Sequence, residues 1–291
     1  MTQLKPYNLA EQKSLFFSSN CSTNPTFHYR VKEIRLFYSR PHKKHLSAAL
    51  SILSSALSPF SGDPKKYESS GGRILTDEEA ETCFMKYIQR VKLEDKIELE
   101  WSEDPVVQTY VTHATKGKCK IVLGKPSTYR QKRMQGVMDH EIGTHIIRKI
   151  NEKMQIWHKK RKKFSLTDFM MIEEGLAAIN QTTSLVKAGD KPFLFLPALH
   201  YVAAYMATKM DFCQLYEFLG KFISDESKRW SECLRVKRGI CDTSEMGGMY
   251  KDQIYFRGAV KILSQRKSID FIALHGGKLN IEDSHRISRS R

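Results

Sequence analysis

Apolar and polar positions follow two patterns along the chain, which together predict a mainly helical protein with a few strands. Apolar residues three or four positions apart, the spacing of a helix with one buried face, recur over residues 45–57, 76–91, 196–210, 212–223, 251–263 and 268–274. Strand patterns mark residues 96–103, 106–114 and 118–123, the last two as a hairpin. We therefore predict an α+β fold in which a small antiparallel sheet precedes the central helices.

The strand Cys119–Gly124 at the end of this sheet can be interpreted in two ways. As an edge strand it could hold an extended substrate by main-chain hydrogen bonds, and as an interior strand of a hairpin it could not. A partial alternation over Phe27–Tyr38 predicts a further strand near the start of the chain.

Composition sets the expected domain limits. Residues 1–24 are polar and rich in Ser, Asn and Lys, and residues 284–291 are basic, so we expect both segments to be disordered. Residues 25–283 are expected to fold as one domain.

The net charge of +16 indicates an acidic partner, which could be a protein tail, an anionic membrane surface or nucleic acid. No phosphate loop or RNA-recognition signature favours nucleic acid. No run of eighteen apolar residues predicts a membrane span. The six cysteines form no Cys-x-x-Cys pair and follow no secretory signal, which is typical of reduced intracellular thiols. The basic run Trp157–Lys163 is either a contact for the acidic partner or a solvated loop.

Two histidines and two carboxylates form the candidate chemistry. His140 and His145 flank Glu141, and the pair Glu173-Glu174 follows some thirty residues later. Three neutral or anionic ligands can hold a zinc ion and leave its fourth position to water, and a further Glu can accept the proton of that water. We assign His140, His145 and Glu174 as zinc ligands and Glu141 as the general base. Glu174 is preferred to Glu173 because it precedes a glycine, which resembles the Glu-Gly signature of zincin metallopeptidases with a glutamate ligand.

The spacing of the histidines predicts an irregular helix. They are five positions apart, which on an α-helix places them about 140° from each other. They can converge on one ion only if the helix widens, and a single π-turn would widen it. Gly143 permits such a distortion. The alternative is that His140 lies on a helix surface and His145 in the core, with no metal.

Five strings resemble the microtubule-associated tyrosine carboxypeptidase family over roughly residues 20 to 283. They are Asn24-Pro-Thr-Phe-His-Tyr29, His140-Glu-Ile-Gly-Thr-His145, Glu173-Glu-Gly-Leu-Ala177, Lys251-Asp-Gln-Ile-Tyr-Phe-Arg-Gly258 and Gly277-Lys-Leu-Asn280. The resemblance implies a zincin-like zinc enzyme of the cytoplasm that works on microtubules and removes the C-terminal tyrosine of α-tubulin. It also implies a longer domain, so we expect this one to be shortened at its C-terminal end.

The resemblance suggests further site residues. A downstream tyrosine stabilises the oxyanion in related zincins, so Tyr255 is either this donor or a core tyrosine. A carboxypeptidase must bind a free carboxylate, for which Lys125, Lys251 and Arg257 are candidates. Two other functions stay open: a zinc peptidase with another acidic substrate, and a weakly active or inactive basic protein that binds microtubules or another acidic partner.

Overall fold

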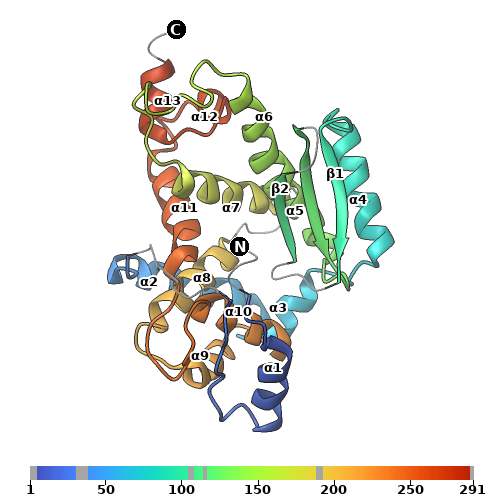
Figure 1. The fold of residues 1–291 in the computed structure, drawn as a ribbon, viewed down its shortest axis with the longest axis vertical. Coiled ribbons are helices and arrows are strands. Elements are labelled where there is room, and N and C mark those ends of the chain that lie inside the picture. Colours follow the sequence, from blue (N-terminus) through green and yellow to red (C-terminus); the bar gives the residue numbers. More distant parts are fainter. Residues whose placement is uncertain (1–4, 31–38, 104–107, 114–116, 188–192, 289–291) are drawn as a thin grey trace. The chain divides into compact units, whose positions relative to one another are not determined.

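The computed structural model describes residues 5–30, 39–103, 108–113, 117–187 and 193–288, which are mainly helical (Figure 1). The chain forms two compact units and passes between them at residues 70, 192 and 256. The first unit comprises Met1–Ser70 and Phe193–Phe256, and the second comprises Gly71–Pro192 and Arg257–Arg291. Residues 25–283, the predicted domain, include parts of both units.

Helices build the first unit around an aromatic core. Its elements are α1 Leu9–Ser18, η2 Lys43–His45, α2 Leu46–Leu57, η3 Ser58–Phe60, α3 Pro64–Ser70, α8 Phe195–Met206, α9 Phe212–Leu219, α10 Glu226–Lys237, η7 Tyr250–Asp252 and the start of α11 Gln253–Gln265. Phe16 of α1 is buried, and its ring centroid lies 4.8 Å from that of Trp230 and 5.3 Å from that of Phe212. This apolar anchor orders α1 within residues 1–24, the segment that the sequence suggested to be disordered.

The second unit combines the sheet with the remaining helices. Its elements are α4 Asp77–Arg90, β1 Ile97–Ser102, β2 Thr109–His113, β3 Cys119–Gly124, η5 Gln131–Arg133, α5 Met134–His140, the π-helix η6 Glu141–Ile146, α6 Ile147–Lys153, α7 Met170–Lys187, the rest of α11, α12 Phe271–His275 and α13 Ile281–Ser288. All three predicted strands are present, at residues close to those expected.

The sheet has the strand order β1-β3-β2 and is mixed, so the prediction of an antiparallel sheet was wrong. β2 and β3 form the expected antiparallel hairpin, whereas β1 runs parallel to β3 with Ile97 opposite Cys119. β3 is therefore the central strand, and the edge interpretation of Cys119–Gly124 was also wrong. Five of its six residues are buried, which suits a strand that is paired on both sides.

One face of the sheet packs on α4 and α5, which lie beside it in Figure 1. Phe84 and Ile88 of α4, Ile121 of β3, Met138 of α5 and Ile142 of η6 belong to one buried cluster. This core fixes the position of the helix that carries the two candidate histidines.

Glycines allow α7 to approach both α5 and α11 closely. A Cβ added to Gly136 of α5 would lie 2.1 Å from the carbonyl oxygen of Gln181 in α7. One added to Gly175, the residue after Glu174, would lie 2.2 Å from the carbonyl carbon of Gly258 in α11. The glycine beside Glu174 is therefore required for helix packing.

Replacing Gly258 with alanine is expected to lower the free energy of unfolding by about 1–3 kcal/mol, because overpacked helices must separate. The new Cβ would lie 1.9 Å from the carbonyl oxygen of Met171. Urea denaturation followed by circular dichroism measures the change. Ser264→Ala, at an exposed position of the same helix, is the control and should change it by less than about 0.5 kcal/mol. An unchanged urea midpoint for Gly258→Ala would contradict the close packing of α7 on α11.

The segment expected to be a disordered basic tail is helical in part. α13 extends to Ser288, and Ser284 within it is fully buried. Arg286 donates hydrogen bonds to the carbonyl of Phe164 and to Asp283, which orders this turn. Most of the predicted strand Phe27–Tyr38 lies outside the described residues. Among the described residues, none of the helices combines the length and apolar content needed to cross a bilayer.

Candidate metal centre

The helix that carries the two histidines widens between them, as the spacing predicted. α5 ends at His140 and continues without a break into the π-helix η6. The Thr144 side chain donates a hydrogen bond to the carbonyl of Asp139 (3.0 Å) and accepts one from Asn180 of α7 (2.8 Å). These bonds stabilise the wide turn and tie it to α7.

The wide turn brings together the three predicted ligands. His140, His145 and Glu174 each offer one ligand atom, and these atoms lie within 4.8 Å of one another. One carboxylate oxygen of Glu174 is buried, has no hydrogen-bond partner among the described residues and lies 3.5 Å from Nε2 of His145. A buried carboxylate oxygen without a donor is costly, and a cation at this point would remove the cost. The two imidazoles and one carboxylate therefore fit a metal ion.

Hydrogen bonds orient both imidazoles toward that point. Nδ1 of His140 lies 2.9 Å from the amide oxygen of Gln181, and Nδ1 of His145 lies 2.8 Å from a carboxylate oxygen of Glu173. Because these oxygens can only accept, each Nδ1 carries the proton and each Nε2 keeps a lone pair for a ligand. Glu173 thus orients His145, while its neighbour Glu174 lies among the candidate ligands.

Glu173 is held by two cations from distant parts of the second unit. Its carboxylate forms ion pairs with Arg148, which is fully buried, and with Lys278. Burial alone would raise the pKa of Glu173, but the hydrogen bond with His145 and the charges of Arg148 and Lys278 lower it to about 2. The carboxylate is therefore ionised and strongly accepts the proton of His145 Nδ1.

Arg148 also fixes the loop between α12 and α13. Its guanidinium donates hydrogen bonds to the carbonyls of Leu274 (3.2 Å), Gly277 (3.1 Å) and Leu279 (2.7 Å). Lys278 lies within this loop, so Arg148 holds Lys278 as well as Glu173. The string Gly277-Lys-Leu-Asn280 is thereby connected to the metal centre.

Glu141 begins the wide turn, directly after the first ligand. Burial raises the pKa of Glu141 most strongly, His145 lowers it and the Glu174 carboxylate raises it, which gives a value of about 7. A carboxylate with a pKa near neutrality is suited to accept and return a proton. A bound cation would lower this pKa.

The comparisons with known proteins show the family of the chain. The model of a family described as microtubule-associated tyrosine carboxypeptidase matches residues 34–291. The chain belongs to this family.

Curated members of the family align with nearly the whole chain. The putative tyrosine carboxypeptidase MATCAP2 of Mus musculus is 34% identical over 293 residues, which cover 99% of this chain and 55% of that protein. Microtubule-associated tyrosine carboxypeptidase 1 of Mus musculus and that of Homo sapiens are each 32% identical over 290 residues, or 97% of this chain and 61% and 60% of theirs. The chain therefore spans little more than half the length of these relatives.

The other predicted site residues are distributed over both units. Lys125 of the second unit pairs with Glu103 at 3.5 Å, and its described contacts include no candidate ligand. Arg257 is the first residue of the second unit on α11, and it is partly buried. Lys251 and Tyr255 belong to the first unit, and Lys251 is buried there.

Tyr255 lies in a polar cluster of the first unit that the sequence did not reveal. Its ring centroid is 5.8 Å from that of His200 and 5.7 Å from the guanidinium carbon of Arg235. Arg235 in turn donates two hydrogen bonds to Asp252 (2.6 and 3.1 Å). The Lys251–Gly258 string, which contains both Asp252 and Tyr255, was the sequence signal for this cluster.

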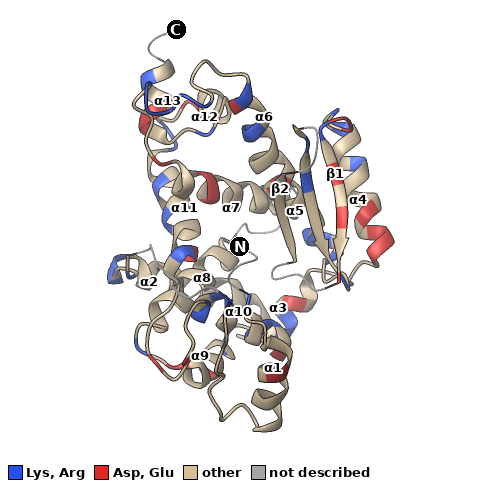
Figure 2. Cartoon of the chain, in the orientation of Figure 1, with Lys and Arg blue, Asp and Glu red and all other residues tan. Residues whose placement is uncertain are grey.

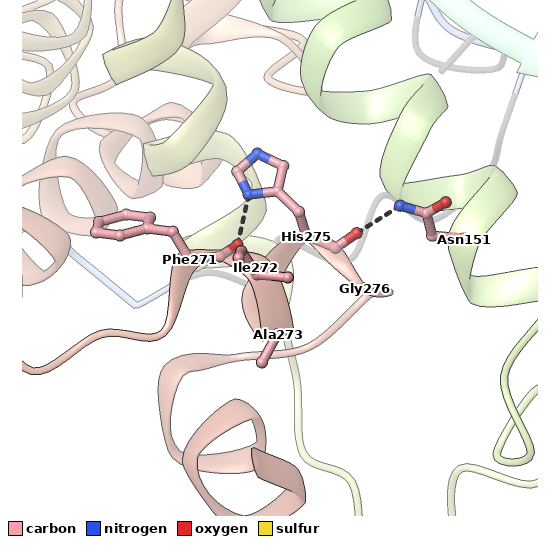
Figure 3. Close-up of a pocket in the computed structure, with 6 residues that line it drawn as sticks. All are labelled: Asn151, Phe271, Ile272, Ala273, His275 and Gly276. Carbon is pink, nitrogen blue, oxygen red and sulfur yellow. Dashed lines mark hydrogen bonds between the residues drawn. The ribbon is translucent and has the colours of Figure 1, made fainter.

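An open cavity of about 500 Å³ lies beside α12 in the second unit and contains none of the candidate ligands (Figure 3). It is lined by Asn151, Phe271, Ile272, Ala273, His275 and Gly276. Nδ1 of His275 donates to the carbonyl of Phe271 at 2.9 Å, and Asn151 donates to the carbonyl of His275 at 2.8 Å. Its polar groups are thus largely occupied by each other.

Proposed function

We propose that the chain is a zinc-dependent carboxypeptidase that removes the C-terminal tyrosine of α-tubulin. The observation that carries this proposal is the convergence of His140, His145 and Glu174 around one point, with Glu141 beside them, in a member of the tyrosine carboxypeptidase family. Two imidazoles and a carboxylate are a ligand set that catalytic zinc sites use.

Each residue of the proposed centre has its own role in the reaction. Zinc, when bound, lowers the pKa of water and polarises a carbonyl. Glu141 accepts a proton from the attacking water and returns it to the leaving amine. Glu173 and Gln181 keep the ligand imidazoles in one tautomer, so that both Nε2 atoms face the ion. Tyr255 is the proposed donor to the developing oxyanion, and Tyr255→Phe tests that role.

The substrate class follows from charge as well as from the family. The net charge of +16 is spread over lysines and arginines of both units (Figure 2). Such a protein attracts acidic polypeptides, and we propose that the acidic tail of α-tubulin is its partner, at microtubules in the cytoplasm. Lys125, Lys251 and Arg257 remain the proposed contacts to the substrate.

The deciding experiment measures free tyrosine released from a peptide that ends in Glu-Glu-Tyr, together with the zinc content of the purified chain. We expect release that a chelator abolishes and that added zinc restores. Peptides that end in Phe or Glu show whether tyrosine is selected. Bound zinc without tyrosine release would refute the tyrosine carboxypeptidase activity. A chain that neither binds zinc nor releases tyrosine would refute the ligand assignment.

A protein that only binds an acidic partner is the second candidate, and the net charge of +16 is the observation that favours it. Such a protein would sediment with microtubules in a salt-sensitive way and would release no tyrosine. Pelleting at two ionic strengths, with the release assay on the same sample, separates the two functions.

Replacing Gln181 with alanine is expected to weaken zinc binding about 10-fold, because the Nδ1 proton of His140 loses its acceptor. Competition with a chelator of known zinc affinity measures the change. Thr183→Ala, at an exposed position of the same helix, is the control and should bind zinc as the unmodified chain does. Equal affinities for the Gln181 variant and the control would refute the supporting role.

A further inference from the structure

Arg238 of the first unit is a buried cation whose Nε has no hydrogen-bond acceptor. The residue is 4% exposed, and its Nε has no hydrogen-bond partner. No hydrogen bond or ion pair joins its side chain to any other residue that the structure describes. The Nε–H group has lost water and gained no acceptor, which is unfavourable unless an anion binds there.

The neighbouring cations of α10 show that this state is exceptional. Arg229 donates to the carbonyls of Ile223 (3.1 Å) and Ser224 (3.2 Å). Lys237 is fully buried and donates to the carbonyls of Met210 (2.8 Å) and Glu245 (2.7 Å). Backbone carbonyls outside α10 thus accept hydrogen bonds from Arg229 and Lys237, whereas no acceptor among the described residues bonds to Arg238.

The carboxylate of Asp252, which acts on Arg238, is already engaged. Both carboxylate oxygens of Asp252 accept hydrogen bonds from Arg235. Burial lowers the pKa of Arg238 most strongly, Asp252 raises it and Arg235 lowers it, as expected for a second guanidinium beside an occupied carboxylate. The guanidinium groups of Arg235 and Arg238 therefore both act on the single carboxylate of Asp252, and Arg235 holds the hydrogen bonds.

The backbone holds Arg238 in place. It follows the last residue of α10 in an extended conformation, and the amide of Gly239 donates to the hydroxyl of Tyr29 at 2.9 Å. A guanidinium on a fixed backbone is preorganised to receive an anion.

We propose that Arg238 is the core of a carboxylate-binding site in the first unit that receives an acidic peptide. The planar fork of a guanidinium matches the two oxygens of a carboxylate. The carboxylate can come from a peptide C-terminus or from a glutamate side chain. The choice of a peptide rests on the proposed function, whereas the anion site itself rests on Arg238 and its surroundings.

Peptide binding to the full chain carrying Glu141→Gln tests this site without hydrolysis. The probes are a fluorescent peptide ending in Glu-Glu-Tyr, its C-terminal amide, and the Gln-Gln-Tyr free acid. Fluorescence anisotropy gives each Kd at constant ionic strength. We expect either the C-terminal amide or the Gln-Gln-Tyr peptide to have a Kd about 10-fold higher than that of the Glu-Glu-Tyr free acid. The peptide that binds more weakly identifies the source of the carboxylate.

Adding Arg238→Gln should reduce the ratio of these two Kd values to less than about two-fold. Lys228→Gln is the control, because it removes one positive charge from a side chain of α10 that is 41% exposed, and it should preserve the ratio. A ratio that Arg238→Gln leaves unchanged would overturn the proposal, as would equal binding of all three peptides before this substitution.

Two further measurements keep the test decisive. If thermal unfolding shows that Arg238→Gln does not fold, Arg238→Lys replaces it. Because a lysine lacks the fork, a reduced ratio supports the site and an unchanged ratio refutes it. Tyrosine release by the unmodified chain is assayed separately. No release, together with a ratio that depends on Arg238, would refute the proposed reaction and retain the carboxylate site.

Discussion

Replacing Glu141 with glutamine is expected to slow tyrosine release by at least about 100-fold while zinc remains bound. The amide has nearly the same shape as the carboxylate but cannot accept a proton at neutral pH. His140, His145 and Glu174, the proposed ligands, are unchanged in this variant, so metal content should not fall. The loss should therefore appear in kcat, because the step that fails is proton transfer.

Release is measured with the peptide ending in Glu-Glu-Tyr, and zinc is quantified on the same preparation. Glu94→Gln makes the same chemical change at an exposed position and should retain full activity. His140→Ala should lose both zinc and release. A Glu141 variant that holds zinc and keeps more than about a tenth of the activity would show that another group accepts the proton.

The metal centre was more predictable than the fold around it, because its evidence is local. The five-residue spacing of His140 and His145 required a wider turn, and the π-helix Glu141–Ile146 provides it. The preference for Glu174 over Glu173 agrees with the geometry, because Glu174 faces the histidines and Glu173 bonds to the Nδ1 side of His145. Spacing along one helix follows directly from its period.

The features that the sequence did not predict depend on contacts between distant segments. The parallel pairing of β1 with β3 joins strands that are separated by β2 in the chain, and alternation within a strand does not reveal its partner. The order of α1 within residues 1–24 depends on Phe16 reaching an aromatic core formed after residue 211. Lys278 reaches Glu173 across 105 positions, which no local pattern indicates.

Arg148 is the residue whose loss should destabilise the second unit most. Arg148→Met is expected to lower the free energy of unfolding of the metal-free chain by about 3–5 kcal/mol, because it breaks a buried ion pair and leaves charge behind. The Glu173 carboxylate would keep Lys278 and His145 but lose its fully buried partner. The carbonyls of Leu274, Gly277 and Leu279 would also lose their donor.

A double-variant cycle separates the ion pair from the carbonyl bonds. Urea denaturation is compared for Arg148→Met, Glu173→Gln and the double variant, with Arg266→Met as an exposed control. If the uncompensated carboxylate causes much of the loss, the double variant should be more stable than Arg148→Met alone, because the remaining glutamine is neutral. Additive losses would assign the effect to the carbonyl contacts of the α12–α13 loop. A loss below about 0.5 kcal/mol for Arg148→Met would contradict both explanations, because an ordinary surface substitution changes the free energy of unfolding by no more than this.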